Sequence, residues 1–137
     1  MTDPIRTVIG FDYGTHLIGV AVGQTLTLQA SPLDAIRSGD WDAIARLVEE
    51  WHPGQFVVGL PLDMQGEPQQ MSKRAERFAR QLEGRFGIPT SMADERLTTR
   101  EAWLVAIESG EHRSKPQIDS LAAALITESW LRALADK

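Results

Sequence analysis

The pattern of hydrophobic and polar positions predicts strands in the first third of the chain. Apolar and often β-branched residues run through positions 7–12 and 18–23, and a glycine-containing turn at 13–16 separates them. Short runs of this kind bounded by turn residues are typical of strands. Residues 26–30 favour a third strand, so we expect three antiparallel strands with short connections.

The spacing of apolar residues then changes to that of an amphipathic helix. Asp40 is placed to cap its first turn, and Pro53-Gly54 is placed to end it. A short apolar run at 55–60 follows and predicts a buried strand. The apolar positions of the helix are Trp41, Ile44, Ala45, Val48 and Trp51.

Helices and strands alternate in the second half of the chain. We expect a helix over 69–86 that ends at Gly87, followed by a strand over 88–93. Thr98 and Glu101 have the spacing of a capping box, in which two side chains satisfy the first backbone N–H groups of a helix. This spacing predicts a third helix.

The last part of the chain has the pattern of a loop and a helix. Polar residues 110–115 predict a mobile loop, and Pro116 fits the first turn of the final helix. Three strands followed by alternating helices and strands imply an α/β fold, with one mixed five-stranded sheet and helices on both of its faces. A length of 137 residues fits a single domain, 1–137, with its own core.

Composition restricts the chemistry that the chain can perform. It has no cysteine, which excludes disulfides, a cysteine nucleophile and thiolate metal sites. Its three histidines, His16, His52 and His112, are scattered and do not form a zinc-binding pair. A metal ion would therefore bind to carboxylates, which favours Mg²⁺ or Mn²⁺.

Charge and hydropathy predict a soluble, cytoplasmic protein without a membrane partner. No segment approaches the ~20 apolar residues of a membrane span, and the N-terminal residues lack the features of a signal peptide. The net charge of -5, from 14 Lys and Arg against 19 Asp and Glu, argues against a nonspecific nucleic-acid coat protein. This net charge does not exclude a nuclease, because a few local Lys and Arg residues can hold a phosphate backbone.

Acidic residues at the ends of predicted elements are candidates for a metal site. Asp12 ends the first strand and Asp94-Glu95 follows the last one, and sites in α/β sheets form at the carboxyl ends of strands. Asp119 lies near the start of the last helix, beside small apolar residues. Each position also has a structural explanation, namely a turn cap, a solvated loop and the helix dipole, respectively.

Some basic and polar residues near these acids could contact phosphates. Arg96 can instead pair with Asp94, and Thr15 can instead cap its turn. A second basic group follows the predicted helix 69–86, opposite its apolar face, although such a stripe is more commonly a solvated surface. The residues near the acids are Thr15, Arg96, Arg113 and Lys115, and the stripe consists of Lys73, Arg74, Arg77 and Arg80.

The order and spacing of five short motifs resemble those of the YqgF/RuvX family over nearly the whole chain. The combination is more specific than any one motif. The motifs are FDYGT at 11–15, IGVAVG at 18–23, VGLPL at 58–62, DERLTT at 94–99 and DSLAA at 119–123.

This resemblance implies a ribonuclease H-like fold and a nuclease activity. Such proteins are described as Holliday junction resolvases and as factors that mature the 5′ end of the 16S rRNA precursor in ribosome biogenesis. The resemblance places the catalytic and metal-binding carboxylates at Asp12, Glu95 and Asp119, and it alone selects Glu95 over Asp94. The implied partner is precursor rRNA or, as the alternative, branched DNA, bound by a monomer or a homodimer.

The sequence is also compatible with two other classes of function. Asp12-Tyr13-Gly14 also matches the start of the phosphate loop of sugar kinases and actin, but those proteins clamp ATP between two such domains and this chain supplies one. A noncatalytic RNA- or protein-binding factor that kept the fold is the other, since a fold does not establish a function. Replacing Asp12 would distinguish that factor from an enzyme.

Overall fold

Five strands form one mixed sheet in the computed structural model, which describes residues 6–61, 65–67, 69–95 and 114–136. Their order across the sheet is β3-β2-β1-β4-β5. The first three strands are antiparallel to one another, whereas β4 is parallel to β1 and β5 is parallel to β4. The strands are β1 (Thr7–Asp12), β2 (Leu17–Gln24), β3 (Gln29–Arg37), β4 (Gln55–Leu60) and β5 (Thr90–Asp94).

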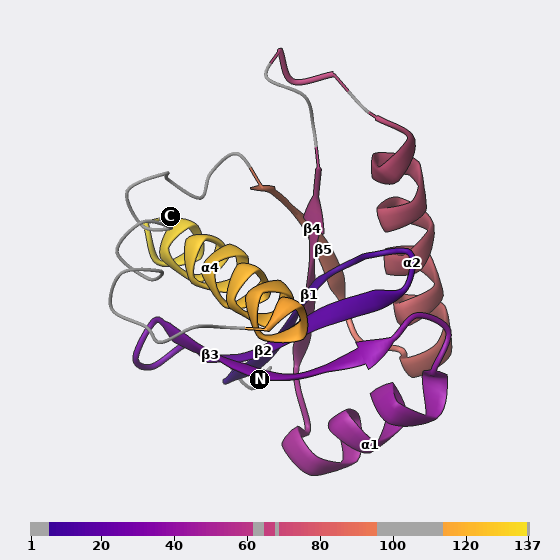
Figure 1. Ribbon diagram of the computed structural model, residues 1–137. Coiled ribbons are helices and arrows are strands. Elements are labelled where there is room, and N and C mark those ends of the chain that lie inside the picture. Colours follow the sequence, from indigo (N-terminus) through magenta and orange to yellow (C-terminus); the bar gives the residue numbers. More distant parts are fainter. Residues whose placement is uncertain (1–5, 62–64, 68, 96–113, 137) are drawn as a thin grey trace.

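Helices cover both faces of this sheet, as predicted (Figure 1). α1 (Trp41–Trp51) and α2 (Gln70–Phe86) lie on one face, and α4 (Lys115–Ala135) crosses the other. No helix among the described residues combines the length and the apolar character that a membrane crossing requires.

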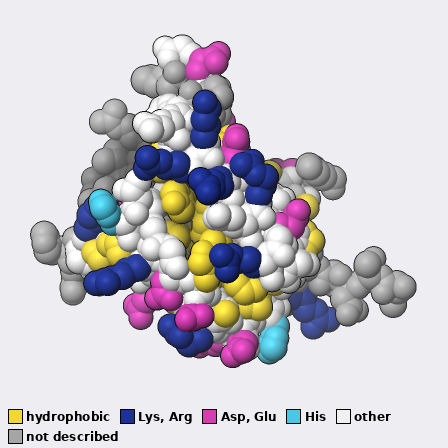
Figure 2. Space-filling model, turned by 90° about the vertical axis from the view of Figure 1, so that its right-hand side faces the viewer, with side chains coloured by type: hydrophobic (Ala, Val, Ile, Leu, Met, Phe, Trp, Pro, Cys, Tyr) yellow, Lys and Arg dark blue, Asp and Glu magenta, His cyan; other side chains and the backbone are white. Residues whose placement is uncertain are grey.

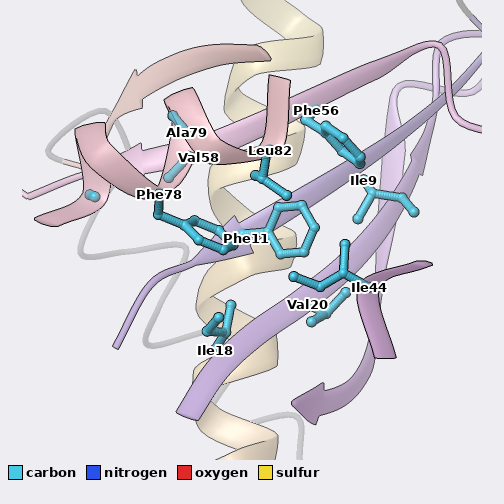
Figure 3. Packing of buried hydrophobic residues seen from close by; sticks show 11 residues of the cluster. Ile9, Phe11, Ile18, Val20, Ile44, Phe56, Val58, Phe78, Ala79 and Leu82 are labelled. Atoms are coloured by element: carbon cyan, nitrogen blue, oxygen red, sulfur yellow. The ribbon is translucent and has the colours of Figure 1, made fainter. Parts of the chain in front are cut away.

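The larger part of the core lies between the sheet and the helices α1 and α2 (Figure 3). Because side chains alternate across a strand, Ile9 and Phe11 of β1 point to this face. The Phe11 ring meets the Phe78 ring of α2 edge to face at 5.5 Å and the Phe56 ring of β4 at 5.6 Å. Such aromatic pairs add to the free energy gained by burial and fix α2 against the centre of the sheet.

The other face packs closely against α4, because glycines of the strands face this helix. A Cβ on Gly10 would lie 1.7 Å from Thr127 Oγ1, and a Cβ on Gly19 would lie 2.0 Å from the Asp119 carbonyl oxygen. Ser120 of α4 accepts a hydrogen bond from the Val20 backbone N–H at 3.1 Å, where the β2–β3 register shifts. The alternation in β1 that exposes Gly10 to α4 also directs Asp12 to this face.

Several predicted bounds are confirmed, and those of β1, β4 and α1 match closely. Asp40 caps α1 by accepting from the Ala43 backbone N–H. The last helix has Pro116 in its first turn, as predicted, but it begins at Lys115, so this residue belongs to α4 and not to the preceding loop. The helix expected from Thr98 lies outside the described residues.

The predicted third strand at 26–30 is wrong in position. Residues 25–28 form a turn in which Leu28 has a left-handed φ of 59° and donates its N–H to the Gln24 carbonyl. β3 begins only at Gln29 and continues to Arg37 as an exposed edge strand, which has no apolar run that a hydrophobicity pattern could detect. β5 likewise begins two residues later than predicted, because Pro89 has no N–H for the sheet.

Candidate active site

Three elements bring the predicted carboxylates to one edge of the sheet. Asp12 is the last residue of β1, and Glu95 directly follows β5. Both strands run in the same direction on either side of β4, so their carboxyl ends lie at the same edge. Asp119 lies on α4, whose close approach to Gly19 carries the start of the helix to the end of β1.

Asp12 and Glu95 are in direct contact. Burial, a side-chain hydrogen bond with Glu95 and the negative charges of Glu95 and Asp119 together raise the pKa of Asp12 to about 8, against the opposing effect of Lys115. Without a cation, the contacting pair of Asp12 and Glu95 therefore holds a proton to a higher pH than an isolated carboxylate would.

Gly59 makes room for Glu95 at the end of β4. A Cβ at this position would lie 2.7 Å from Glu95 Oε1 and 2.8 Å from Ile126 Cδ1. Glu95 therefore occupies the space above the sheet where other residue types would place a side chain. This packing gives a long, flexible side chain a defined position.

Asp119 forms an ion pair with Lys115, one helical turn before it. The Lys115 Nζ lies 3.2 Å from Asp119 Oδ2 and 3.4 Å from Oδ1, and the lysine side chain is 78% exposed. A cation in the first turn of a helix opposes the helix dipole. Lys115 is therefore better explained by the acidic cluster than by the stability of α4.

A pocket of about 260 Å³ opens over two of the carboxylates, Asp12 and Asp119. Thr15 and Lys115, both predicted as phosphate contacts, also line it. The sequence did not single out several other lining residues, among them His16, Leu17 and Met71. The position of His16 in the turn that follows Asp12 was an available signal, whereas nothing local pointed to Met71.

The described residues do not include three metal-binding side chains already gathered as a complete ligand set. Two carboxylates touch, and the third is turned toward Lys115. The donor set nevertheless fits a hard divalent cation, because it consists of carboxylate oxygens. A proton held by the Asp12–Glu95 pair and the ammonium of Lys115 offset part of the negative charge of the three carboxylates.

The structure leaves part of the predicted site without a description. Arg96 and Arg113, like His112, lie outside the described residues. Asp94 lies at the end of β5, paired in the sheet with Leu60.

Comparison with known sequences identifies a family and close relatives. A sequence model of the RuvX family, described as Holliday junction resolvase, matches residues 6–133. A protein of Azotobacter vinelandii is 52% identical over 133 residues, which cover 92% of this chain and 93% of the relative. One of Pseudomonas paraeruginosa is 48% identical over 135 residues, covering 93% of each chain. Both relatives are named, provisionally, as a pre-16S rRNA nuclease.

Comparison with solved structures confirms a ribonuclease H-like fold. Thermus thermophilus RuvC in complex with a Holliday junction substrate has a TM-score of 0.63 at 15% identity, covering 93% of this chain and 96% of that one. The Fowlpox virus resolvase has a TM-score of 0.58 at 11% identity, covering 93% and 98% of the two chains. At these identities the likeness establishes the fold alone.

Proposed function

Because the chain belongs to the RuvX family, we propose that it is a nuclease that uses a divalent cation, Mg²⁺ or Mn²⁺, to hydrolyse phosphodiester bonds in structured nucleic acid. The observation that carries this proposal is the convergence of Asp12, Glu95 and Asp119 at one sheet edge. Such a set of oxygen ligands beside an open pocket is what metal-assisted phosphodiester hydrolysis requires.

The carboxylates would hold the cation. Asp12 and Asp119 would bind it directly, and Glu95 would bind it or orient the attacking water. When bound, the cation would polarise the phosphate and lower the pKa of a water molecule. Asp12 would give up its proton, and Asp119 would exchange its ion pair with Lys115 for the metal.

The polar residues around the pocket would bind the substrate strand. If Asp119 binds the cation, its ion pair with Lys115 is broken, and the Lys115 ammonium is then free to contact a phosphate oxygen. The Thr15 hydroxyl lines the same pocket. We extend this role to Arg96 and Arg113, which are neighbours in sequence of Glu95 and Lys115.

The proposed substrate is the 5′ end of the 16S rRNA precursor, and the process is ribosome biogenesis in the cytoplasm. The names of the relatives from Azotobacter and Pseudomonas support this choice. A four-way DNA junction is the second candidate, favoured by the description of the family. A four-way junction is two-fold symmetric, so it would require a homodimer, whereas a monomer would suffice for rRNA.

Metal-dependent cleavage tests the proposal. The purified protein and its Asp12→Asn variant would be incubated with a labelled rRNA precursor fragment, a four-way DNA junction and plain single strands, with Mg²⁺, Mn²⁺ or chelator. We expect cleavage that requires the cation and falls at least 100-fold in the variant, since the substitution removes a metal ligand. Asp34→Asn, which alters an exposed carboxylate in β3, is the matched control.

The products identify the substrate class. Specific 5′ processing of the rRNA fragment supports the first candidate, and paired symmetric cuts in the junction support the second. Cleavage that persists in Asp12→Asn would refute the site. If the wild type cleaves none of the substrates, a noncatalytic factor would be favoured.

A further inference from the structure

The exposed side of α2 carries a row of cations whose charges are not balanced within the helix. Figure 2 shows Lys and Arg side chains gathered on the face of the molecule that contains α2. Arg77 has Arg74 and Arg80 three residues away on either side and Lys73 four residues before it. Like charges at these spacings destabilise a helix, and Glu76 lies at a compensating spacing from Lys73 and Arg80 but not from Arg77.

Arg74 and Arg77 form no ion pair with any residue that the structure describes. No acidic residue lies three or four positions from either arginine on α2. The guanidinium groups are therefore available for an external anion.

The two arginines line a pocket of about 320 Å³ together with Tyr13, Thr15 and Gln81. Tyr13 and Thr15 also line the carboxylate pocket, so the two pockets adjoin at the turn after Asp12. A single strand of nucleic acid could therefore occupy both pockets at once.

The position of the arginine pocket is fixed by packing. The Tyr13 ring lies on the buried Phe78 ring of α2 at 5.0 Å, which ties the end of β1 to this helix. Met71 lines the carboxylate pocket. A rise of about 1.5 Å per residue puts Arg74 and Arg77 about 4.5 and 9 Å farther along the helix axis.

We propose that Arg74 and Arg77, with Thr15 and Gln81, bind a backbone phosphate of the substrate strand next to the phosphate cleaved at Asp12. The inference rests on the proposed nuclease function, because that function supplies the strand. Guanidinium groups suit this ligand, since their planar donors bind two phosphate oxygens at once. The pocket would thereby set the path of the strand toward the carboxylates.

Binding measured without cleavage tests this inference. Fluorescence anisotropy in chelator would give the Kd of a labelled rRNA precursor fragment and of a four-way DNA junction over a range of salt concentrations. The variant is Arg74→Gln/Arg77→Gln. The control is Arg46→Gln/Arg132→Gln, which has the same net charge but alters exposed arginines on α1 and α4.

For the tighter-binding substrate, we expect the variant to raise the Kd about tenfold or more. The slope of log Kd against log salt should fall by about 0.7–0.9 for each phosphate contact that is lost. The control should stay within about twofold of the wild type. Arg74→Lys/Arg77→Lys should retain most of the salt slope but not the full affinity, because lysine keeps the charge without the planar donors.

Specific results would overturn the inference. Equal losses in variant and control would mean a general charge effect, and an unchanged variant or a wild type that binds neither probe would mean no phosphate site. Labelled polyglutamate serves as a third probe, and loss of its binding in the variant with intact nucleic-acid binding would point instead to an acidic protein partner. Equal thermal unfolding of variant and wild type would exclude misfolding as the cause of a weaker Kd.

These measurements distinguish failure of the nuclease proposal from failure of the phosphate-site proposal. Asp12→Asn should bind both probes as the wild type does while losing cleavage. A variant-specific loss of binding without any cleavage by the wild type would refute the nuclease and keep the phosphate site. Cleavage by the wild type together with unaltered binding in the arginine variant would refute the phosphate site and keep the nuclease.

Discussion

Asp12 is buried beside other carboxylates, and this arrangement disfavours its charged form when no cation is bound. It is placed beside Glu95 and near Asp119, and these neighbours together with burial raise its pKa from 3.8 to about 8. The folded state therefore binds a proton that the unfolded chain releases over this range. Because stability falls with pH wherever the folded state binds more protons, Asp12 destabilises the metal-free protein increasingly from pH 3.8 to about 8.

Replacing Asp12 by Asn should remove this penalty. In chelator, we expect Asp12→Asn to unfold at a higher temperature than the wild type at pH 8, by several degrees. The difference, on the order of a few kcal/mol at most, should shrink as the pH is lowered toward 3.8 and level off above about 8. Thermal unfolding followed by circular dichroism measures it.

A pH-independent difference would contradict the assigned cause. Asp34→Asn is again the control, since this carboxylate is exposed on β3. Its unfolding temperature should follow that of the wild type at every pH.

The sequence placed individual site residues only as far as strand ends could be recognised. Asp12 follows an apolar run and the Asp94-Glu95 pair follows an expected strand at 88–93, so the edge of the sheet was predictable. The choice of Glu95 came from the family resemblance, because hydrophobic periodicity cannot distinguish adjacent acids. The ion pair of Lys115 with Asp119 was missed because Lys115 was assigned to a loop and not to α4.

At the scale of elements, α4 carries Asp119 at a distance from the sheet that glycines determine. Apolar periodicity predicted this helix but not how closely it packs, since it cannot show which small residues face each other. Gly19 is the critical contact, because its missing side chain leaves space for the Asp119 backbone. The edge strand β3 shows the same limit, as its exposure leaves no apolar signal.

Gly19→Ala should affect stability and activity together. Its Cβ would lie 2.0 Å from a backbone carbonyl that cannot move without α4. We expect a loss of about 1–3 kcal/mol in the free energy of unfolding, typical of overpacking, measured by urea denaturation. Cleavage should fall as well, because α4 must shift and carries Asp119 with it.

Gly84→Ala is the matched control for this substitution. Gly84 lies within α2, and an added Cβ would meet nothing within 4 Å. Alanine should stabilise the helix by about 0.5–1 kcal/mol and leave cleavage unchanged. Full activity in Gly19→Ala, or a loss in Gly84→Ala, would contradict this account of α4.

At the scale of the whole molecule, the site joins parts of the fold that otherwise meet only through packing. Asp12 and Glu95 belong to the sheet edge, and Asp119 belongs to the helix on one face. A cation held by all three would link sheet and helix. The alternation of strands and helices sufficed to predict this general architecture, whereas the arginine pocket emerged only when α2 and the turn after Asp12 were placed together.

Cation binding should therefore stabilise the entire domain. At pH 8, Mg²⁺ or Mn²⁺ at about 100 times its Kd should add about 2.7 kcal/mol to the free energy of unfolding. Differential scanning calorimetry should show an increase of several degrees in Tm for the wild type. Asp12→Asn should show little increase, and an equal increase in both proteins would place the cation elsewhere.

The glycine-lined contact of α4 has a consequence for a saturation mutagenesis screen. A Cβ on Gly23 would lie 2.9 Å from Thr127 Cγ2 and 3.0 Å from Leu131 Cδ1, so this glycine faces side chains of α4, whereas Gly19 faces its backbone. Thr127 is eight residues from Asp119, about 12 Å along a helix. Because α4 moves as one rigid helix, a substitution at its far end also displaces Asp119. Substitutions that reduce activity should therefore extend along the whole contact between α4 and the strand glycines, well beyond the carboxylates themselves.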